Sequence, residues 1–178
     1  MDVNRGIRRS YLIAFLVLVA AVVIPIVVRW AVEPVGPTVE LVDLSGRTRT
    51  LRLREIEDLP RLCRRGSYEN QFGNWRDEGE YCGVLLTELL DAEADYVSLL
   101  VVAEDGYRVE IERERLEDPD YPAVLAFSFD GRTVPDWADG YRIAVLPVDG
   151  AVSNADYGVE SAGSYWVKNV VRLTLQSQ

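Results

Sequence analysis

Short segments that alternate apolar and polar residues fill most of the chain after residue 37, and glycine-containing pairs separate them. Successive side chains of a strand point to opposite faces, so this period of two predicts strands with one buried face. Ser45-Gly46, Asp105-Gly106 and Asp130-Gly131 are typical of tight turns between antiparallel neighbours. No strand–helix–strand rhythm indicates a parallel sheet. We therefore expect an α+β domain, mostly β, built of antiparallel or mixed sheets with short peripheral helices.

The expected elements can be placed along the chain. Strands are predicted at 38–44, 47–53, 66–75, 96–103, 107–111, 124–129, 141–146 and 166–175. Short helices or helical turns are predicted at 54–59, 85–92 and 112–116. The charged segment 76–80 is expected to be an exposed loop, and Thr87 is expected to cap the helix that follows. A long loop rich in Gly, Ser, Asn and Asp should cover 149–164.

An uncharged apolar run at the N-terminus indicates a membrane anchor. Tyr11 to Val28 contain no charged residue, and a helix of that length is about 27 Å long, enough to cross a bilayer. Three arginines precede the run and one follows it directly, which predicts a cytoplasmic N-terminus. A cleaved signal peptide is the alternative, but no small-x-small cleavage site follows the run. The expected organisation is a cytoplasmic N-terminus, a membrane span, a linker and an extracytoplasmic domain, at 1–10, 11–30, 31–37 and 38–178.

Composition excludes several kinds of chemistry. The chain has a net charge of −10, which argues against a nucleic-acid partner because phosphates require a basic surface. It contains no histidine, which excludes Ser-His-Asp and Cys-His nucleophiles and histidine-bound metals. Met1 is the only methionine. A metal would therefore depend on carboxylates, on Cys63 and Cys82, or on a cofactor that supplies its own ligands.

The two cysteines allow two interpretations. An extracytoplasmic domain permits a disulfide, and closing a loop of this size adds about 3 kcal/mol of stability in the chain-entropy model. Two buried free thiols are the alternative. Cys63 is followed by Arg64 and Arg65, and their charge would favour the thiolate of a free Cys63. Cys82 precedes the predicted helix and is expected to serve packing or a disulfide.

Several local motifs occur in an order that resembles the molybdopterin-binding domain of the sulfite-oxidase family. They are Leu59-Pro60, the run YCGVLLTELL at 81–90, DGY at 105–107, a strand from Gly140 to Pro147, and Trp-Val-Lys at 166–168. The resemblance covers residues 39–175. It implies a mixed α+β domain with a cleft for a pyranopterin, in which a cysteine thiolate and the pterin dithiolene bind molybdenum. Such a site performs oxygen-atom transfer.

The resemblance also implies candidate site residues. Cofactor contacts would come from Tyr68, Asn70, Asn74, Trp75, Arg142 and Lys168, with the two basic side chains holding the pterin phosphate. The metal-binding cysteine of the family falls where this chain has residues 66–70, which include no cysteine. Cys63 lies a few residues early and is a catalytic metal ligand only if the register of its strand allows it. The metal ligand is thus missing from its expected place.

Three functions remain open at this stage. The first is a membrane-anchored molybdopterin-binding-like domain that has lost catalysis and binds a ligand or a partner protein, with or without molybdopterin. The second is an active molybdenum or tungsten oxidoreductase that uses Cys63. It would need an external electron acceptor because the chain carries no haem or iron–sulfur motif. The third is an extracytoplasmic β-rich adhesion or assembly domain.

Overall fold

The computed structural model describes residues 36–90 and 95–177. The domain they belong to, Gly36–Gln178, is a compact unit of the chain. The membrane span expected at 11–30 and the linker up to residue 35 lie outside the described residues. Within the part that is described, no helix has the length and apolar character needed to cross a membrane.

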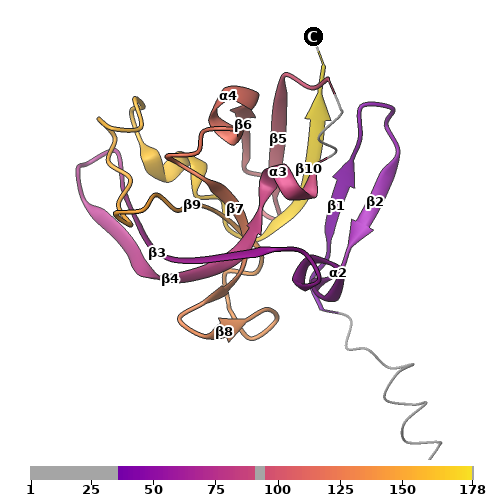
Figure 1. Ribbon diagram of the computed structural model, residues 1–178, viewed down its shortest axis with the longest axis horizontal. Helices are drawn as coiled ribbons and strands as arrows, with labels where there is room; N and C mark the ends of the chain where they lie inside the picture. The colour runs from indigo at the N-terminus through magenta and orange to yellow at the C-terminus, as the bar shows by residue number, and fades with distance from the viewer. Residues whose placement is uncertain (1–35, 91–94, 178) are drawn as a thin grey trace, which may run out of the picture. The chain divides into compact units, whose positions relative to one another are not determined.

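The first of two sheets is mixed (Figure 1). Its strands, in spatial order, are β2 (Thr48–Leu51), β1 (Val39–Val42), β10 (Val170–Gln176), β5 (Ser98–Ala103) and β6 (Arg108–Glu112). β1 runs parallel to β10, with Leu41 opposite Leu173, and the other neighbours are antiparallel. The first and last strands of the domain are therefore hydrogen-bonded neighbours in one sheet.

The second sheet is antiparallel throughout the described strands and is built around a long hairpin. Its members are β3 (Arg61–Glu69), β4 (Trp75–Leu85), β7 (Ala123–Phe129), β8 (Arg132–Thr133) and β9 (Arg142–Val145). They follow the order β3-β4-β7-β8, and β9 also pairs with β7. β7 and β9 are buried along almost their whole length, and apart from Ser128 and Arg142 they consist of apolar residues.

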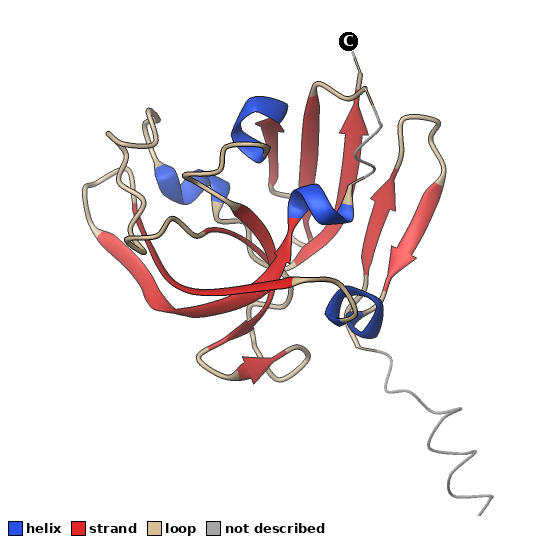
Figure 2. Cartoon of the chain, viewed as in Figure 1, coloured by secondary structure: helices blue, strands red, loops and turns tan. Residues whose placement is uncertain are grey.

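Helices are few and short, as Figure 2 shows. They are α2 (Leu53–Glu57), α3 (Leu86–Leu89), α4 (Arg113–Leu116) and the 3₁₀-helix η1 (Ala162–Tyr165). The helices contribute Ile56, Leu86, Leu89, Leu116 and Ala162 to one core cluster that also contains inward residues of both sheets. A mostly β domain with mixed and antiparallel sheets and a few short helices was predicted from the period-two pattern, and this prediction is confirmed.

Two local predictions around β4 are wrong. The charged segment 76–80 is strand, and the turn lies earlier, between Glu69 and Trp75. The segment pairs with β3, and its side chains alternate between exposed Glu78 and Glu80 and the inward positions 77, 79 and 81. Tertiary pairing therefore overrides the local charge density. The following helix spans only Leu86–Leu89, and Leu85 occupies the cap position predicted for Thr87.

A disulfide joins the two strands of the hairpin. Cys63 and Cys82 lie directly opposite each other in the β3–β4 register, with Cα atoms 4.2 Å apart, and their sulfurs are bonded. Cys63 is exposed and Cys82 is half-buried, so the bond lies on the outer face of the hairpin. Of the two interpretations of the cysteines, the structure shows the disulfide.

Removing this crosslink should destabilise the domain. Because the cysteines are 19 positions apart, the Cys63→Ser/Cys82→Ser variant should lose about 3 kcal/mol of unfolding free energy. Urea unfolding of both proteins, with and without a thiol reductant, measures this. The reductant should lower the stability of the native chain to that of the variant and leave the variant unchanged. Equal stability of all four samples would contradict a stabilising crosslink.

Candidate functional site

A buried arginine lies at the centre of a four-residue ion network. Arg142, the first residue of β9, is 1% exposed. Its Nη2 lies 2.6 Å from Oδ2 of Asp77, and its Nη1 lies 3.1 Å from Oδ2 of Asp139. Lys168 Nζ lies 3.3 Å and 3.1 Å from the same two oxygens. Two cations and two carboxylates, which we call the Arg142 cluster, therefore have no net charge.

Backbone hydrogen bonds bring the basic side chains of the cluster together. The segment before β10 lies along β9: Ile143 N donates to Val167 O at 2.9 Å, and Val170 N donates to Tyr141 O at 2.8 Å. Asn169, whose φ is 48°, donates its N–H to Asp139 O at 2.7 Å. Residues 142 and 168 thus become neighbours because two distant segments pair.

Asp77 reaches the cluster from β4 through an unusual backbone conformation. Its φ of 52° lies in the left-handed region, which costs a non-glycine residue roughly 1–3 kcal/mol. Tyr81 from the same strand donates its hydroxyl hydrogen to Asp77 O at 2.7 Å. The ion pairs of the carboxylate and this hydrogen bond offset the cost of the conformation.

Aromatic rings surround the guanidinium. Arg142 Cζ lies 5.7 Å from the ring centroids of Tyr68 and Tyr81 and 5.4 Å from that of Trp166. Gly66 makes room for this packing, because a Cβ there would lie 2.8 Å from the Trp166 ring and 2.7 Å from Leu146. The faces of the rings favour a cation, and the guanidinium among them is buried, whereas the carboxylates of Asp77 and Asp139 remain 29% and 28% exposed.

Asp77 keeps its charge over the neutral pH range. Burial alone would raise the pKa of Asp77, but the hydrogen bond and charge of Arg142, with help from Lys168, outweigh it and hold that pKa below its ordinary value. Burial and the charge of Asp77 raise the pKa of Tyr68. Neither Asp77 nor Tyr68 can therefore exchange a proton readily near neutral pH, so neither is suited to general acid–base work.

The Arg142 cluster does not fit a pterin phosphate. Arg142 and Lys168 each contact Oδ2 of Asp77 and Oδ2 of Asp139. A phosphate that approached the two cations would therefore meet a cluster with no net charge and two acidic side chains. The buried N–H groups that lack an acceptor among the described residues include Arg142 Nε and Trp166 Nε1. Each is a single donor packed among the same rings, and no fork of free donors is left to grip an anion.

The predicted cofactor residues divide into two groups. Arg142 and Lys168 do come together, and Tyr68 joins them, with its hydroxyl 3.3 Å from Asp77 Oδ2. Asn70, Asn74 and Trp75 lie in or beside the β3–β4 turn instead. Asn70 Oδ1 accepts hydrogen bonds from backbone N–H groups of this turn, and Trp75 is 51% exposed.

Cys63 belongs to neither group. Its sulfur is bonded to Cys82 on the outer face of the hairpin, so it offers no thiolate to a metal. Elsewhere in residues 36–90 and 95–177, no three His, Cys, Asp or Glu side chains are grouped so that they could hold a metal ion.

Sequence reasoning missed the acidic half of the cluster. Asp77 lies in the charged segment that was predicted to be an exposed loop, and no role was predicted for Asp139. A signal for Asp77 was present, because residues 77, 79 and 81 share the inward face of β4 once the segment is read as strand. The spacing of three residues between Asp139 and Arg142 was a signal for Asp139.

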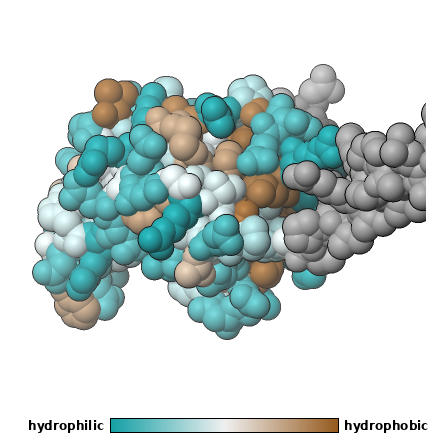
Figure 3. Space-filling model, turned by 90° about the horizontal axis from the view of Figure 1, so that it is seen from below, coloured by the Kyte–Doolittle hydropathy of each residue, from teal (hydrophilic) through white to brown (hydrophobic). Residues whose placement is uncertain are grey.

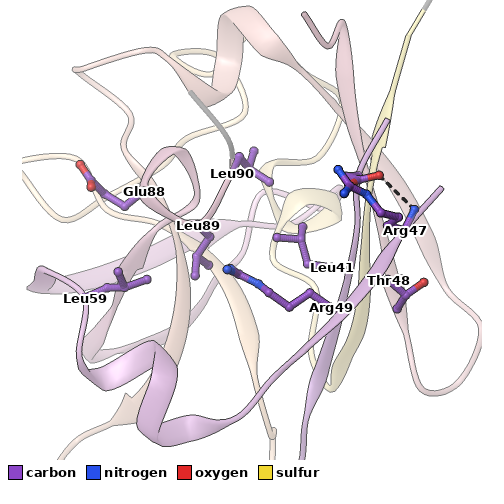
Figure 4. A pocket seen from close by; sticks show the side chains of 9 residues that line it. Leu41, Arg47, Thr48, Arg49, Leu59, Glu88, Leu89 and Leu90 are labelled. Atoms are coloured by element: carbon purple, nitrogen blue, oxygen red, sulfur yellow. Dashed lines mark hydrogen bonds and ion pairs between the residues drawn. The ribbon is translucent and has the colours of Figure 1, made fainter. Parts of the chain in front are cut away.

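A hollow lies elsewhere on the domain. It has a volume of about 570 Å³ and shares no residue with the Arg142 cluster. Four leucines, Leu41, Leu59, Leu89 and Leu90, are among the residues that line it. Figure 4 shows the Arg49 side chain extending from β2 toward Leu89. The surface seen from below is mostly hydrophilic, with apolar side chains only in separate patches (Figure 3), as a net charge of −10 suggests.

Removing the central cation should destabilise the domain strongly. Arg142→Met leaves Asp77 and Asp139 with Lys168 alone, and breaking a buried pair in this way should cost about 3–5 kcal/mol of unfolding free energy. Arg132→Met, at an exposed position, is the control and should change stability by less than about 0.5 kcal/mol. Urea unfolding measures both, and similar small effects would show that the cluster contributes little.

The stabilisation by Asp77 should depend on pH. Its pKa in the folded domain lies below the ordinary value of 3.8, so its contribution is complete above that value and is lost as pH falls through the folded pKa. Asp77→Asn should therefore destabilise the domain most near pH 7, and the difference from the native chain should shrink below about pH 4. Denaturant unfolding at a series of pH values tests this. A pH-independent difference would mean that the carboxylate charge is irrelevant.

Comparison with known proteins supports a conclusion about the fold only. No protein-family model matches the sequence, and no curated protein matches it in sequence. A solved structure that is similar is the sulfane dehydrogenase SoxCD from Paracoccus pantotrophus, with a TM-score of 0.58 and 18% identity. The match covers 80% of this chain and 38% of that one. The domain thus has a fold related to part of that enzyme, as the resemblance to a molybdenum-enzyme family led us to expect.

Proposed function

We propose that the chain is a membrane-anchored, extracytoplasmic partner-binding module with a fold of the sulfite-oxidase type and no redox catalysis of its own. The Arg142 cluster is the observation that carries this proposal. The resemblance assigns Arg142 and Lys168 to the phosphate of a pterin. In this chain both cations are neutralised by Asp77 and Asp139.

Electrostatics favour the internal network over a bound cofactor. The carboxylates already supply the negative charge that a phosphate would bring, and they do so on the same chain, without the loss of translational freedom that binding costs. To bind a phosphate the domain would have to break ion pairs around a buried guanidinium. Asp77 and Asp139, whose side chains are 29% and 28% exposed, would then lose their partner, and breaking a buried ion pair in this way costs about 3–5 kcal/mol.

The state of the cysteines supports the same conclusion. The chain has two cysteines, and both are used by the disulfide. A molybdenum centre of the type that the resemblance implies needs one free thiolate from the protein, and a carboxylate is not an equivalent donor to a soft thiolate. The disulfide also supports an extracytoplasmic location, because such bonds persist in oxidising compartments.

The membrane anchor is supported by sequence alone. The uncharged run from Tyr11 to Val28 has the length and composition of a membrane helix, and the arginines that precede it favour a cytoplasmic N-terminus. A domain held at a membrane, without a reactive centre, acts by presenting a surface to a ligand or to another protein.

Metal and pterin analysis of the purified full-length chain tests the proposal. We expect molybdenum and tungsten well below one atom per ten chains by mass spectrometry, and no fluorescent pterin after oxidative extraction. Near-stoichiometric molybdenum or tungsten in the native chain, lost on Cys63→Ser, would overturn the proposal and favour an active oxidoreductase.

A further inference from the structure

The two sulfurs of the disulfide differ in their access to solvent. Cys63 on β3 is exposed, whereas Cys82 on β4 is half-buried. Thiol–disulfide exchange begins when a thiolate attacks one of the two sulfurs and forms a mixed disulfide with it. Access is one of the factors that decide which sulfur is attacked. Exposure therefore favours attack on Cys63.

The half of β3 that carries Cys63 has a free edge. β3 is the end strand of its sheet, and β4 is its neighbour. Further along β3, Val152 N donates to Ser67 O at 3.0 Å and Glu69 N donates to Val152 O at 2.9 Å, so a second segment borders that half. Among the described residues, the backbone hydrogen bonds of residues 61–65 join β4 alone. In this part of the chain, no strand therefore lies on the outer side of Cys63.

The direction of attack increases the difference between the two sulfurs. A thiolate attacks a disulfide sulfur in line with the bond that breaks, and the rate depends on access to that sulfur. A thiolate that attacks Cys63 expels Cys82, so it arrives from the side of β3 that faces away from β4, which is the free edge. A thiolate that attacks Cys82 would arrive over β7, where Ser128 lies opposite Cys82 and is 8% exposed. The arrangement of the sheet thus favours attack on Cys63.

The domain is expected to stay folded when the bond opens. Hydrogen bonds pair β3 with β4 on both sides of the crosslink, and Arg64 Nη1 donates to Leu146 O at 2.9 Å. Tyr81 of β4 is completely buried and packs against Trp166. The stability loss predicted above for the disulfide-free variant is smaller than the total stability of a typical domain. Reduction should therefore loosen residues 61–65 locally and leave the core intact.

We propose that the Cys63–Cys82 bond is a reversible thiol–disulfide exchange site, at which a dithiol protein forms a mixed disulfide with Cys63. The first thiolate of that protein bonds to Cys63 Sγ, the Cys63–Cys82 bond breaks, and Cys82 leaves as a thiolate. The second thiolate then attacks the dithiol protein's own sulfur in the mixed disulfide and releases Cys63. The two thiols of the dithiol protein lose two electrons and become a disulfide, and their electrons and protons convert Cys63 and Cys82 to thiols.

This site goes beyond the proposed binding function because it makes the crosslink of the hairpin adjustable. In the disulfide state the two strands are fixed to each other. In the dithiol state, residues 61–65 at the free edge open more readily. The exchange does not depend on metal content, so bound molybdenum would contradict the proposed function and leave the exchange site standing.

Reaction of the oxidised full-length chain with reduced glutathione identifies the attacked sulfur. Samples are quenched with acid, and the glutathione adduct is located by mass spectrometry of the peptides. Chains with one adduct should carry glutathione on Cys63 at least tenfold more often than on Cys82. Reduced thioredoxin in excess, as a dithiol protein, should convert the bond to two thiols. A smaller preference for Cys63, or a bond that thioredoxin leaves intact, would overturn the proposed site.

Two single variants are matched controls because each lacks the crosslink. Cys82→Ser leaves the thiol of Cys63, and Cys63→Ser leaves the thiol of Cys82. Each variant is mixed with oxidised glutathione, and the formation of the mixed disulfide is followed by mass spectrometry. The Cys63 thiol should react at least tenfold faster, because it is exposed at the free edge. A smaller difference in rate would mean that the sheet does not select the sulfur.

The effect of urea distinguishes exchange on the folded domain from exchange after unfolding. If only the unfolded chain reacted, 1 M urea would accelerate reduction by glutathione about fivefold or more, because urea lowers the free energy of unfolding. We expect a smaller acceleration at urea concentrations below the unfolding transition. Tryptophan fluorescence of the reduced chain should stay native, because Trp137 and Trp166 are buried. A fivefold acceleration, or a reduced chain that unfolds, would show that the bond is a permanent structural crosslink.

Discussion

A guanidinium removed from water must be compensated where it lies, and this requirement organises the centre of the domain. Arg142 forms one network with Asp77 of β4, Asp139 of the loop before β9 and Lys168 of the segment before β10. Asp77 accepts a left-handed backbone conformation to reach it. Three aromatic rings and Gly66 surround the guanidinium, so strands from distant parts of the chain are held together through one side chain.

The same network explains why this centre is a poor place for chemistry. Its charges cancel, its carboxylate at position 77 has a lowered pKa, and its aromatic neighbours fill the space above Gly66. The hairpin that supplies Asp77 and Tyr81 to the interior also carries Phe72 and Trp75 outward. The interior pairs make the hairpin rigid, and the disulfide holds its two strands together.

The fold class could be predicted because its signals are local. Alternation and turn pairs depend on residues within a few positions of each other, and they placed β5, β7 and β9 close to where the structure has them. The stretch around β4 was misread for the same reason. Its charged residues are typical of a loop when only neighbouring positions are considered, but pairing with β3 and β7 makes the stretch a strand. The candidate site was half predicted, with its cations identified and its carboxylates missed.

By itself, the sequence determined the mostly β character, the absence of histidine chemistry and the apolar N-terminal run. Only the tertiary structure decided that Cys63 lies opposite Cys82, that β1 pairs with β10 in parallel, and that Asp77 meets Arg142. These contacts join residues from 19 to 132 positions apart. The period of the sequence pattern predicts to which face of its own strand a side chain points. Its contacts with distant residues depend on strand register and on the need to neutralise a buried charge, which the pattern does not contain.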